Sequence, residues 1–217
     1  MVNNLYTSAH GAYLAPAVVA LYSAARKTEV PLKCTLVTDA SLSGLDVDGL
    51  RSLFREQNAK LEFFDWTKVE TGILPSIQAR FRNSSLAMAW MFVDQIFPIE
   101  TSRAVYVDSD TMALGSIADL FDLELGEDCT AAVFDYAMLP KRPMTDGARA
   151  LERAASNRRF NSGVLVQDIS CYREQGVARA CVDYLNSGPA SIDNFADQDT
   201  LNVVCRGKIR EMSPIYN

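Results

Sequence analysis

The most informative segment of this chain is Arg103-Ala-Val-Tyr-Val-Asp-Ser-Asp-Thr-Met-Ala-Leu-Gly-Ser-Ile-Ala-Asp-Leu-Phe121. Residues 104–107 form a short apolar run, typical of a buried strand, and Asp108 and Asp110 follow that run directly. In open α/β sheets, ligands bind beyond the carboxyl ends of the strands. The segment therefore predicts a sheet edge that presents two carboxylates to a ligand.

On both sides of this segment, short apolar runs alternate with amphipathic stretches of helical length, as in proteins with crossover connections. We predict strands at residues 5–8, 32–38, 61–64, 104–107, 131–134, 163–167 and 209–212. We predict helices at residues 13–26, 178–186 and 198–205, and two more after residues 41 and 84. The fold class expected is α/β: one Rossmann-like domain over residues 1–217, with a mixed, mostly parallel central sheet flanked by helices.

Two of these helices have specific expectations attached. The first is capped by Ser41 or Ser43 and turns four apolar side chains inward: Leu45, Leu50, Leu53 and Phe54. The second begins at Ser84 or Ser85 and has one apolar face: Leu86, Met88, Met91, Phe92 and Ile96.

The composition of the chain excludes some classes of partner and location. The chain has 48% hydrophobic and 22% charged residues, as ordinary globular proteins do. A net charge of -6 argues against nucleic acid as a partner, because phosphate binding needs dense Lys and Arg. No apolar run is long enough for a transmembrane segment. The five cysteines are odd in number and widely spaced, so we expect reduced thiols. We expect a cytoplasmic protein and leave peripheral membrane contact open.

Asp108 and Asp110 have three possible explanations. Two carboxylates one residue apart, where a strand ends, can bind one hard cation such as Mn²⁺ or Mg²⁺. Alternatively, Asp-x-Asp is a polar loop, because aspartate favours turns. A phosphatase of the haloacid dehalogenase type also begins with strand-Asp-x-Asp, but that motif lies near the N-terminus and has Thr or Val where this chain has Met112.

Two further motifs follow the acidic pair in order. One is Phe160-Asn-Ser-Gly-Val-Leu-Val166, and the other is Asp197-Gln-Asp-Thr-Leu-Asn202, which is followed by Pro214-Ile-Tyr-Asn217. Together the three motifs resemble family 8 glycosyltransferases in order and spacing, over nearly the whole chain. The resemblance implies the GT-A fold and transfer of a hexose, with retention of anomeric configuration, from a UDP-sugar donor to a glycan or glycolipid acceptor.

The resemblance also implies roles for individual residues. Asp108 and Asp110 would bind Mn²⁺ or Mg²⁺, and Ser109 would lie near the donor ribose. Asn161 would lie near the transferred sugar. The catalytic candidates are Asp135, Asp197 and Gln198. Two local explanations stay open: Asn161 as turn chemistry, and Asp197 as the N-cap of a helix that starts at Gln198.

Several positions depart from the family pattern. His10 stands where an acidic residue helps to seat the uracil, and Tyr13 follows it as a second donor-binding candidate. Trp90 stands where the family has an arginine. Family members continue beyond Tyr-Asn with a His-x-x-Gly-x-x-Lys-Pro-Trp stretch, whereas this sequence stops at Asn217. We therefore expect a chain lacking that segment, or a metal held by two carboxylates, water and substrate.

The basic residues between Lys141 and Arg159 are either a solvated face or an acceptor loop. Two hypotheses for the whole chain follow from these observations. The first is a metal-dependent, retaining hexosyltransferase that uses UDP-galactose or UDP-glucose. The alternative is a catalytically silent module that binds a nucleotide sugar and transfers nothing.

Overall fold

The computed structural model describes residues 2–39, 42, 45–69, 85–136, 159–187 and 192–217. Their strands form one sheet in the order β3-β2-β1-β4-β6-β5-β7. The strands are β1 (Asn3–Ser8), β2 (Leu32–Thr38), β3 (Ala59–Asp65), β4 (Arg103–Val107), β5 (Thr130–Phe134), β6 (Phe160–Asp168) and β7 (Ile209–Met212). Each predicted strand is confirmed, with ends that differ by a few residues.

The direction of β6 matters most for the site. All neighbouring pairs in the sheet are parallel except the two that β6 makes with β4 and β5, so the predicted mixed, mostly parallel sheet is confirmed. Because β6 runs antiparallel to β4, the beginning of β6 lies beside the end of β4, with Val107 opposite Val164. The residues that enter β6 therefore share an edge with those that leave β4.

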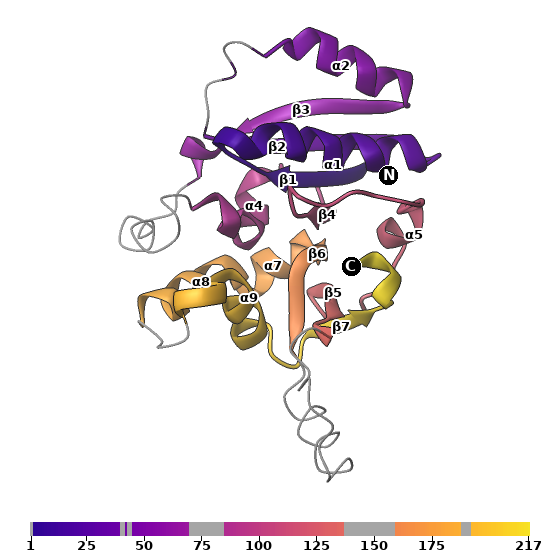
Figure 1. The fold of residues 1–217 in the computed structure, drawn as a ribbon. Coiled ribbons are helices and arrows are strands. Elements are labelled where there is room, and N and C mark those ends of the chain that lie inside the picture. Colours follow the sequence, from indigo (N-terminus) through magenta and orange to yellow (C-terminus); the bar gives the residue numbers. More distant parts are fainter. Residues whose placement is uncertain (1, 40–41, 43–44, 70–84, 137–158, 188–191) are drawn as a thin grey trace, which may run out of the picture.

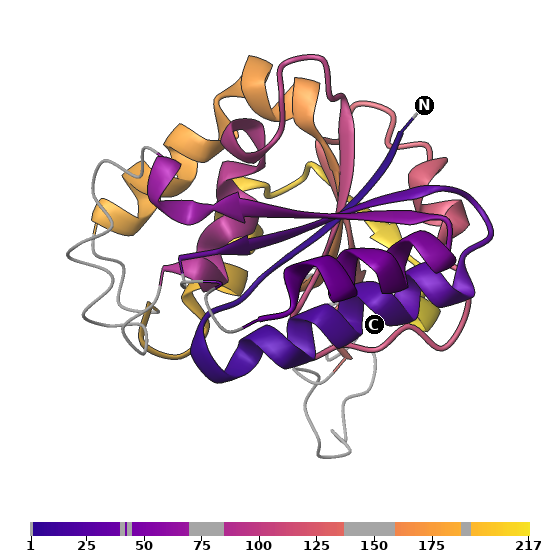
Figure 2. The same ribbon diagram turned by 90° about the horizontal axis from the view of Figure 1, so that it is seen from above.

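Helices cover both faces of the sheet. The helical segments are η1 (Gly11–Tyr13), α1 (Leu14–Lys27), α2 (Val47–Glu56), η2 (Trp66–Lys68), η3 (Leu86–Phe92), α4 (Val93–Ile96), α5 (Ala118–Phe121), α7 (Ile169–Gln175), α8 (Val177–Asn186), α9 (Ile192–Val204) and η5 (Pro214–Tyr216). In Figure 1, α4, α8 and α9 lie on one side of β6, and α5 and η5 lie on the other. Figure 2 shows α1 and α2 running side by side along one face. Alternate strand residues face the two resulting cores: Leu5 and Val105 one core, Tyr6 and Tyr106 the other.

The predictions for α2 are partly wrong. Its N-cap is Asp46, whose carboxylate accepts a hydrogen bond from the Gly49 amide at 2.9 Å, and Ser41 and Ser43 lie outside the described residues. Phe54 is fully buried, but Leu45 and Leu53 are 38% and 45% exposed. The helix packs on β3, an edge strand, so only a narrow stripe of it is covered.

Two other helices also differ from expectation. The segment after Ser85 is a 3₁₀ helix followed by one α-helical turn, and burial surrounds it instead of following one face. Trp90 within it is fully buried in the core. The last long helix starts at Ile192, six residues before the predicted start at Gln198.

The expectation of five reduced thiols is wrong for two of them. Cys129 and Cys171 form a disulfide, which joins the residue before β5 to the first turn of α7. Cys34, Cys181 and Cys205 are free and buried. The pairing is invisible in the sequence because the two cysteines meet only through the packing of α7 against the sheet. Among the described residues, no helix is long and apolar enough to cross a membrane.

Arg173 of α7 holds the turn that precedes β4. Its guanidinium donates to five backbone carbonyls at 3.0 to 3.3 Å, those of Asp94, Phe97, Pro98, Ile99 and Thr101. Lysine cannot reproduce this planar fork. We expect Arg173→Lys to lower the free energy of unfolding by about 1–3 kcal/mol, measured by urea denaturation.

Arg179→Lys is the matched control, because Arg179 makes an exposed pair with Asp183. That control is expected to change stability by less than about 0.5 kcal/mol. Equal effects of the two substitutions would show that the five carbonyl contacts add nothing.

Candidate functional site

Asp108 begins a tight turn at the end of β4. Its amide donates to the Gly163 carbonyl at 2.8 Å, and its carbonyl accepts from the Thr111 amide at 3.2 Å and the Thr111 hydroxyl at 2.7 Å. Ser109 and Asp110 are the two corner residues of this turn, and Asp110 is exposed. The turn predicted for the Asp-x-Asp segment is confirmed, and it holds Asp108 against the sheet while Asp110 reaches toward solvent.

The entry to β6 lies beside this turn. The Asn161 side-chain oxygen accepts from the Gly163 amide at 2.6 Å, so the local turn chemistry considered for Asn161 is present. The same side chain also contacts α9, because its Nδ2 lies 3.4 Å from Oε1 of Gln198. Asn161 therefore has a local role and a contact with another candidate at once.

Gln198 connects the candidates that come from three different elements. Its Nε2 donates to Asp135 Oδ2 at 2.6 Å, and its Oε1 faces the Asn161 amide. Asp135 follows β5, Asn161 is the second residue of β6, and Gln198 lies in α9. Both Asp135 and Gln198 are buried, at 8% and 6% exposed. The amide of Gln198 is thus held in one orientation by its two neighbours.

Asp197 joins the same group from the neighbouring position of α9. Its carboxylate accepts from the Ser162 hydroxyl at 2.7 Å. Because α9 starts at Ile192, Asp197 lies inside the helix, and the N-cap explanation for it is wrong. Burial raises the pKa of Asp197, against the opposing effect of the Ser162 hydrogen bond.

Negatively charged side chains lie close together at this edge of the sheet. Burial raises the pKa of Asp108 to about 7, and the negative charges of Asp197 and Asp110 add to the rise. The hydrogen bond from the Tyr106 hydroxyl, at 2.9 Å, acts in the opposite direction. Carboxylates that repel one another in a desolvated place favour either a proton or a cation.

A divalent cation fits this donor set. Asp108 and Asp110 offer carboxylate oxygens, which Mg²⁺ and Mn²⁺ prefer, and a cation would relieve the repulsion around Asp108. In the described part of the chain, no three His, Cys, Asp or Glu side chains gather closely enough to hold a metal. Water molecules would therefore complete the coordination of an ion at Asp108 and Asp110, and substrate oxygens would replace some of them once substrate binds.

Three residues hold the candidate side chains in place but were not predicted from the sequence. Tyr106 donates to Asp108, and Ser162 donates to Asp197. Asn202 bonds both the amide and the carbonyl of Phe160, at 2.7 and 2.8 Å, and so fixes β6 against α9. A signal existed for two of them: Tyr106 shares a strand face with Asp108 at a spacing of two, and Asn202 shares a helix face with Gln198 at a spacing of four.

Two candidates for binding the nucleotide-sugar donor, His10 and Tyr13, are not part of this hydrogen-bond network. His10 is half-buried and is the N-cap of η1, and Tyr13 is 46% exposed. The structure shows no hydrogen bond from either side chain to another described residue. Both follow β1, which pairs in parallel with β4, so they share the edge at which Asp108 lies. Of the predicted basic stretch, only Arg159 is described, and it pairs with Asp199 at 2.5 Å.

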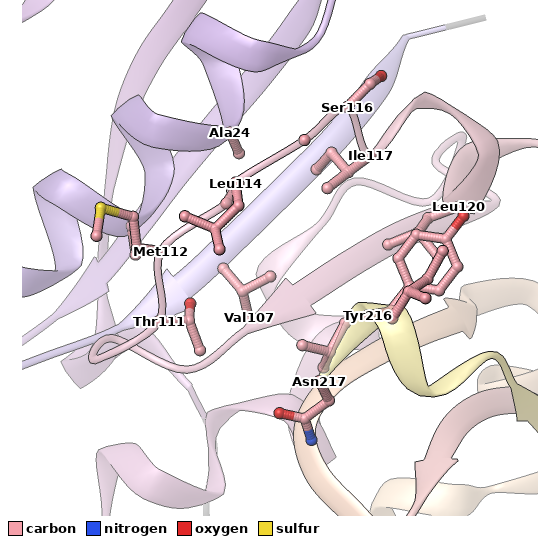
Figure 3. Close-up of a pocket in the computed structure, with 15 residues that line it drawn as sticks. Ala24, Val107, Thr111, Met112, Leu114, Ser116, Ile117, Leu120, Tyr216 and Asn217 are labelled. Carbon is pink, nitrogen blue, oxygen red and sulfur yellow. The ribbon is translucent and has the colours of Figure 1, made fainter.

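A cavity of about 530 Å³ adjoins the edge on the side of α1 (Figure 3). It is lined by α1, by the loop after Asp110 and by residues 215–217. Two lining residues contact the candidate site: the Thr111 hydroxyl donates to the Asp108 carbonyl, and the Asn217 side-chain amide donates to Asn161 Oδ1. No Asp, Glu, Lys, Arg or His side chain lines this cavity. Asp108 and Asp110 are not among its lining residues, so the cavity adjoins the candidate site without containing its carboxylates.

Proteins with similar sequences are longer than this chain. General stress protein A of Bacillus subtilis strain 168 is 28% identical over 121 residues, which are 53% of this chain and 38% of that protein. The lipopolysaccharide 1,2-glucosyltransferase of Escherichia coli K12 is 25% identical over 130 residues, 58% of this chain and 37% of that protein. The matches thus span well under half the length of these curated relatives.

Solved structures show the same fold. Galactosyltransferase LgtC, in complex with donor and acceptor sugar analogs, matches 97% of this chain and 73% of its own with a TM-score of 0.76 and 18% identity. Apo-form glycosyltransferase GlyE of Streptococcus pneumoniae TIGR4 matches 100% of this chain and 46% of its own, with a TM-score of 0.73 and 19% identity. The predicted GT-A fold is confirmed. The sequence profile of glycosyl transferase family 8 matches residues 4–217, and the chain therefore belongs to that family.

Proposed function

We propose that this chain is a metal-dependent, retaining hexosyltransferase. The observation that carries the proposal is the meeting of Asp108, Asp135, Asn161, Asp197 and Gln198 at one edge of the sheet, with Gln198 hydrogen-bonded to Asp135 and facing Asn161. Leaving-group departure from a sugar creates positive charge at the anomeric carbon. Carboxylate and amide oxygens fixed in a buried place stabilise that charge without having to reorganise.

The residues divide into two groups by the charge that they face. Asp135, Asp197 and Gln198 would line the side of the sugar, where the carbon becomes electron-poor. Asp108 and Asp110 would face the diphosphate through a divalent cation, which when bound neutralises charge on the leaving group. Ser109, Asn161, His10 and Tyr13 would hold the donor along the same edge.

We propose UDP-galactose or UDP-glucose as the donor and a glycan or glycolipid as the acceptor. Supporting this choice, one relative is a lipopolysaccharide 1,2-glucosyltransferase and another, from Salmonella typhimurium strain LT2, is a lipopolysaccharide 1,3-galactosyltransferase. The apolar cavity at Thr111 and Asn217 is compatible with an acceptor that has an apolar part.

Calorimetric titration tests the donor site. UDP, UDP-galactose and UDP-glucose are titrated with Mn²⁺ and without it, into the wild-type protein and into the Asp108→Ala, Asp110→Ala double variant. We expect Mn²⁺ to tighten donor binding by at least about tenfold in the wild type, and the double variant to lose this gain, because the metal is needed at the diphosphate.

The matched control is the Asp119→Ala, Asp122→Ala double variant, which removes the same charge from exposed positions near α5. It is expected to bind as the wild type does. A folded wild-type protein that binds no donor in the presence of Mn²⁺ would overturn the proposal. Metal-dependent binding without transfer to any glycan would favour the silent module.

A further inference from the structure

The two carboxylate oxygens of Asp108 have different surroundings. Oδ1 accepts a hydrogen bond from the Tyr106 hydroxyl at 2.9 Å. Oδ2 lies over the α-carbon of Gly163, 3.0 Å from the point where a β-carbon at that position would stand. Oδ1 is thus hydrogen-bonded to a buried side chain of the core, and Oδ2 occupies space that is open only because residue 163 is a glycine.

Tyr106 is held firmly enough to act as a fixed donor. Its side chain is buried, and its ring packs edge-on against Tyr6 with 5.2 Å between the centroids. The nearest alternative partner of its hydroxyl is Ser8 Oγ at 3.5 Å, and Ser8 donates its own proton to the Leu86 carbonyl at 2.7 Å. The shorter and better contact for the Tyr106 proton is Asp108 Oδ1.

Gly163 controls the other oxygen. A β-carbon at this position would stand 2.9 Å from Asn161 Oδ1 as well as 3.0 Å from Asp108 Oδ2. Both distances are shorter than normal carbon-oxygen contacts, and both of the atoms encountered are ends of side chains. An added methyl group would therefore displace the Asp108 carboxylate and the Asn161 amide, while the backbone of β6 could stay where it is.

We propose that Tyr106 and Gly163 are positioning residues that select Oδ2 of Asp108 as the oxygen offered to a divalent cation. This inference rests on the proposed metal site and goes beyond it by naming the residues that orient its buried ligand. Partners of a metal ligand that make no contact with the metal commonly change affinity by about 10- to 100-fold when they are removed. The Tyr106 hydroxyl and the empty space at Gly163 are such partners of Asp108.

The test measures the affinity for Mn²⁺ alone. Mn²⁺ is titrated into metal-free protein, and the free ion is followed by electron paramagnetic resonance, for the wild type, Tyr106→Phe, Gly163→Ala and Asp108→Asn. We expect Tyr106→Phe and Gly163→Ala each to raise the Kd for Mn²⁺ by about tenfold or more. Loss of the Tyr106 hydroxyl lets the Asp108 carboxylate rotate, and the methyl group added at position 163 displaces its Oδ2.

Two control variants separate positioning from general damage to the fold. Tyr6→Phe removes the hydroxyl of the neighbouring buried tyrosine, which bonds Gln167 and not Asp108. Gly115→Ala adds a methyl group where no atom lies within 4 Å. Both are expected to bind Mn²⁺ within about twofold of the wild type, and thermal unfolding confirms that all variants are folded.

The outcomes distinguish this inference from the function on which it rests. If the wild type binds Mn²⁺ and Asp108→Asn does not, but Tyr106→Phe and Gly163→Ala bind as the wild type does, the positioning roles are wrong and the metal site stands. If the wild type fails to bind Mn²⁺, the metal site and the positioning roles are both wrong. Weaker binding in Tyr6→Phe to the same extent as in Tyr106→Phe would also overturn the role of Tyr106.

Discussion

Replacing Gln198 with alanine is expected to lower kcat for sugar transfer by about 100- to 1000-fold, the usual cost of losing one fixed group that stabilises charge in a transition state. The Gln198 amide is held between Asp135 and Asn161, at 2.6 and 3.4 Å, so its orientation is set before substrate arrives. Because this stabilisation is needed chiefly as charge develops, the KM for donor should change by less than about threefold. Steady-state kinetics with the donor identified by calorimetry measures both constants.

Gln175→Ala is the matched control, since Gln175 is an exposed glutamine at the end of α7. It should leave both constants unchanged. A loss in kcat below about tenfold for Gln198→Ala would place the reactive centre elsewhere on the edge. A large rise in KM with an unchanged kcat would make Gln198 a binding residue with no part in the chemical step.

The second large effect concerns stability in the absence of metal. The pKa of Asp108 rises from 3.8 to about 7 on folding. Between pH 4 and 7 the unfolded chain has lost the Asp108 proton and the folded protein has kept it, so rising pH favours unfolding. Asp108→Asn removes this cost. Relative to the wild type, the variant should gain about 2–4 kcal/mol of unfolding free energy between pH 4 and pH 8.

Urea denaturation in the presence of a chelator, at both pH values, measures this gain. Asp119→Asn, at an exposed position, is the control and should show a constant difference from the wild type. Addition of Mn²⁺ should stabilise the wild type at pH 8, since a ligand that binds only the folded state adds to its stability. A pH-independent difference for Asp108→Asn would show that the carboxylate is better solvated than its burial implies.

Much of the fold could be predicted because strand residues follow simple patterns. The run before Asp108 is apolar and short, as expected for a buried strand. The position of Asp108 at the carboxyl end of that strand, where α/β sheets bind ligands, follows from the general behaviour of such sheets. The meeting of Asp108 with Asn161 is different. It depends on β6 running antiparallel to its neighbours, and the apolar pattern of a buried strand contains no information about direction.

The remaining differences have the same origin in tertiary packing. Leu53 has the spacing of an inward-facing residue but lies on a helix that covers an edge strand, and it stays 45% exposed. Of the candidate site residues, only Asp108 and Asp110 follow from the sequence pattern itself. The others, Asp197 and Gln198 among them, could be named only through the resemblance to a family. Helical spacing alone predicts a shared face for Gln198 and Asn202, but not which strand that face meets.

The Cys129–Cys171 disulfide has a consequence for the integrity of the site. The two cysteines are 42 residues apart, and the segment between them contains Asp135, Asn161, Ser162 and Gly163. A single cut in the backbone anywhere within that segment leaves the two fragments covalently joined. The fragments could then separate only after reduction as well as cleavage, so the half of the edge that holds Asp108 stays tethered to the half that holds Gln198 even in a nicked molecule.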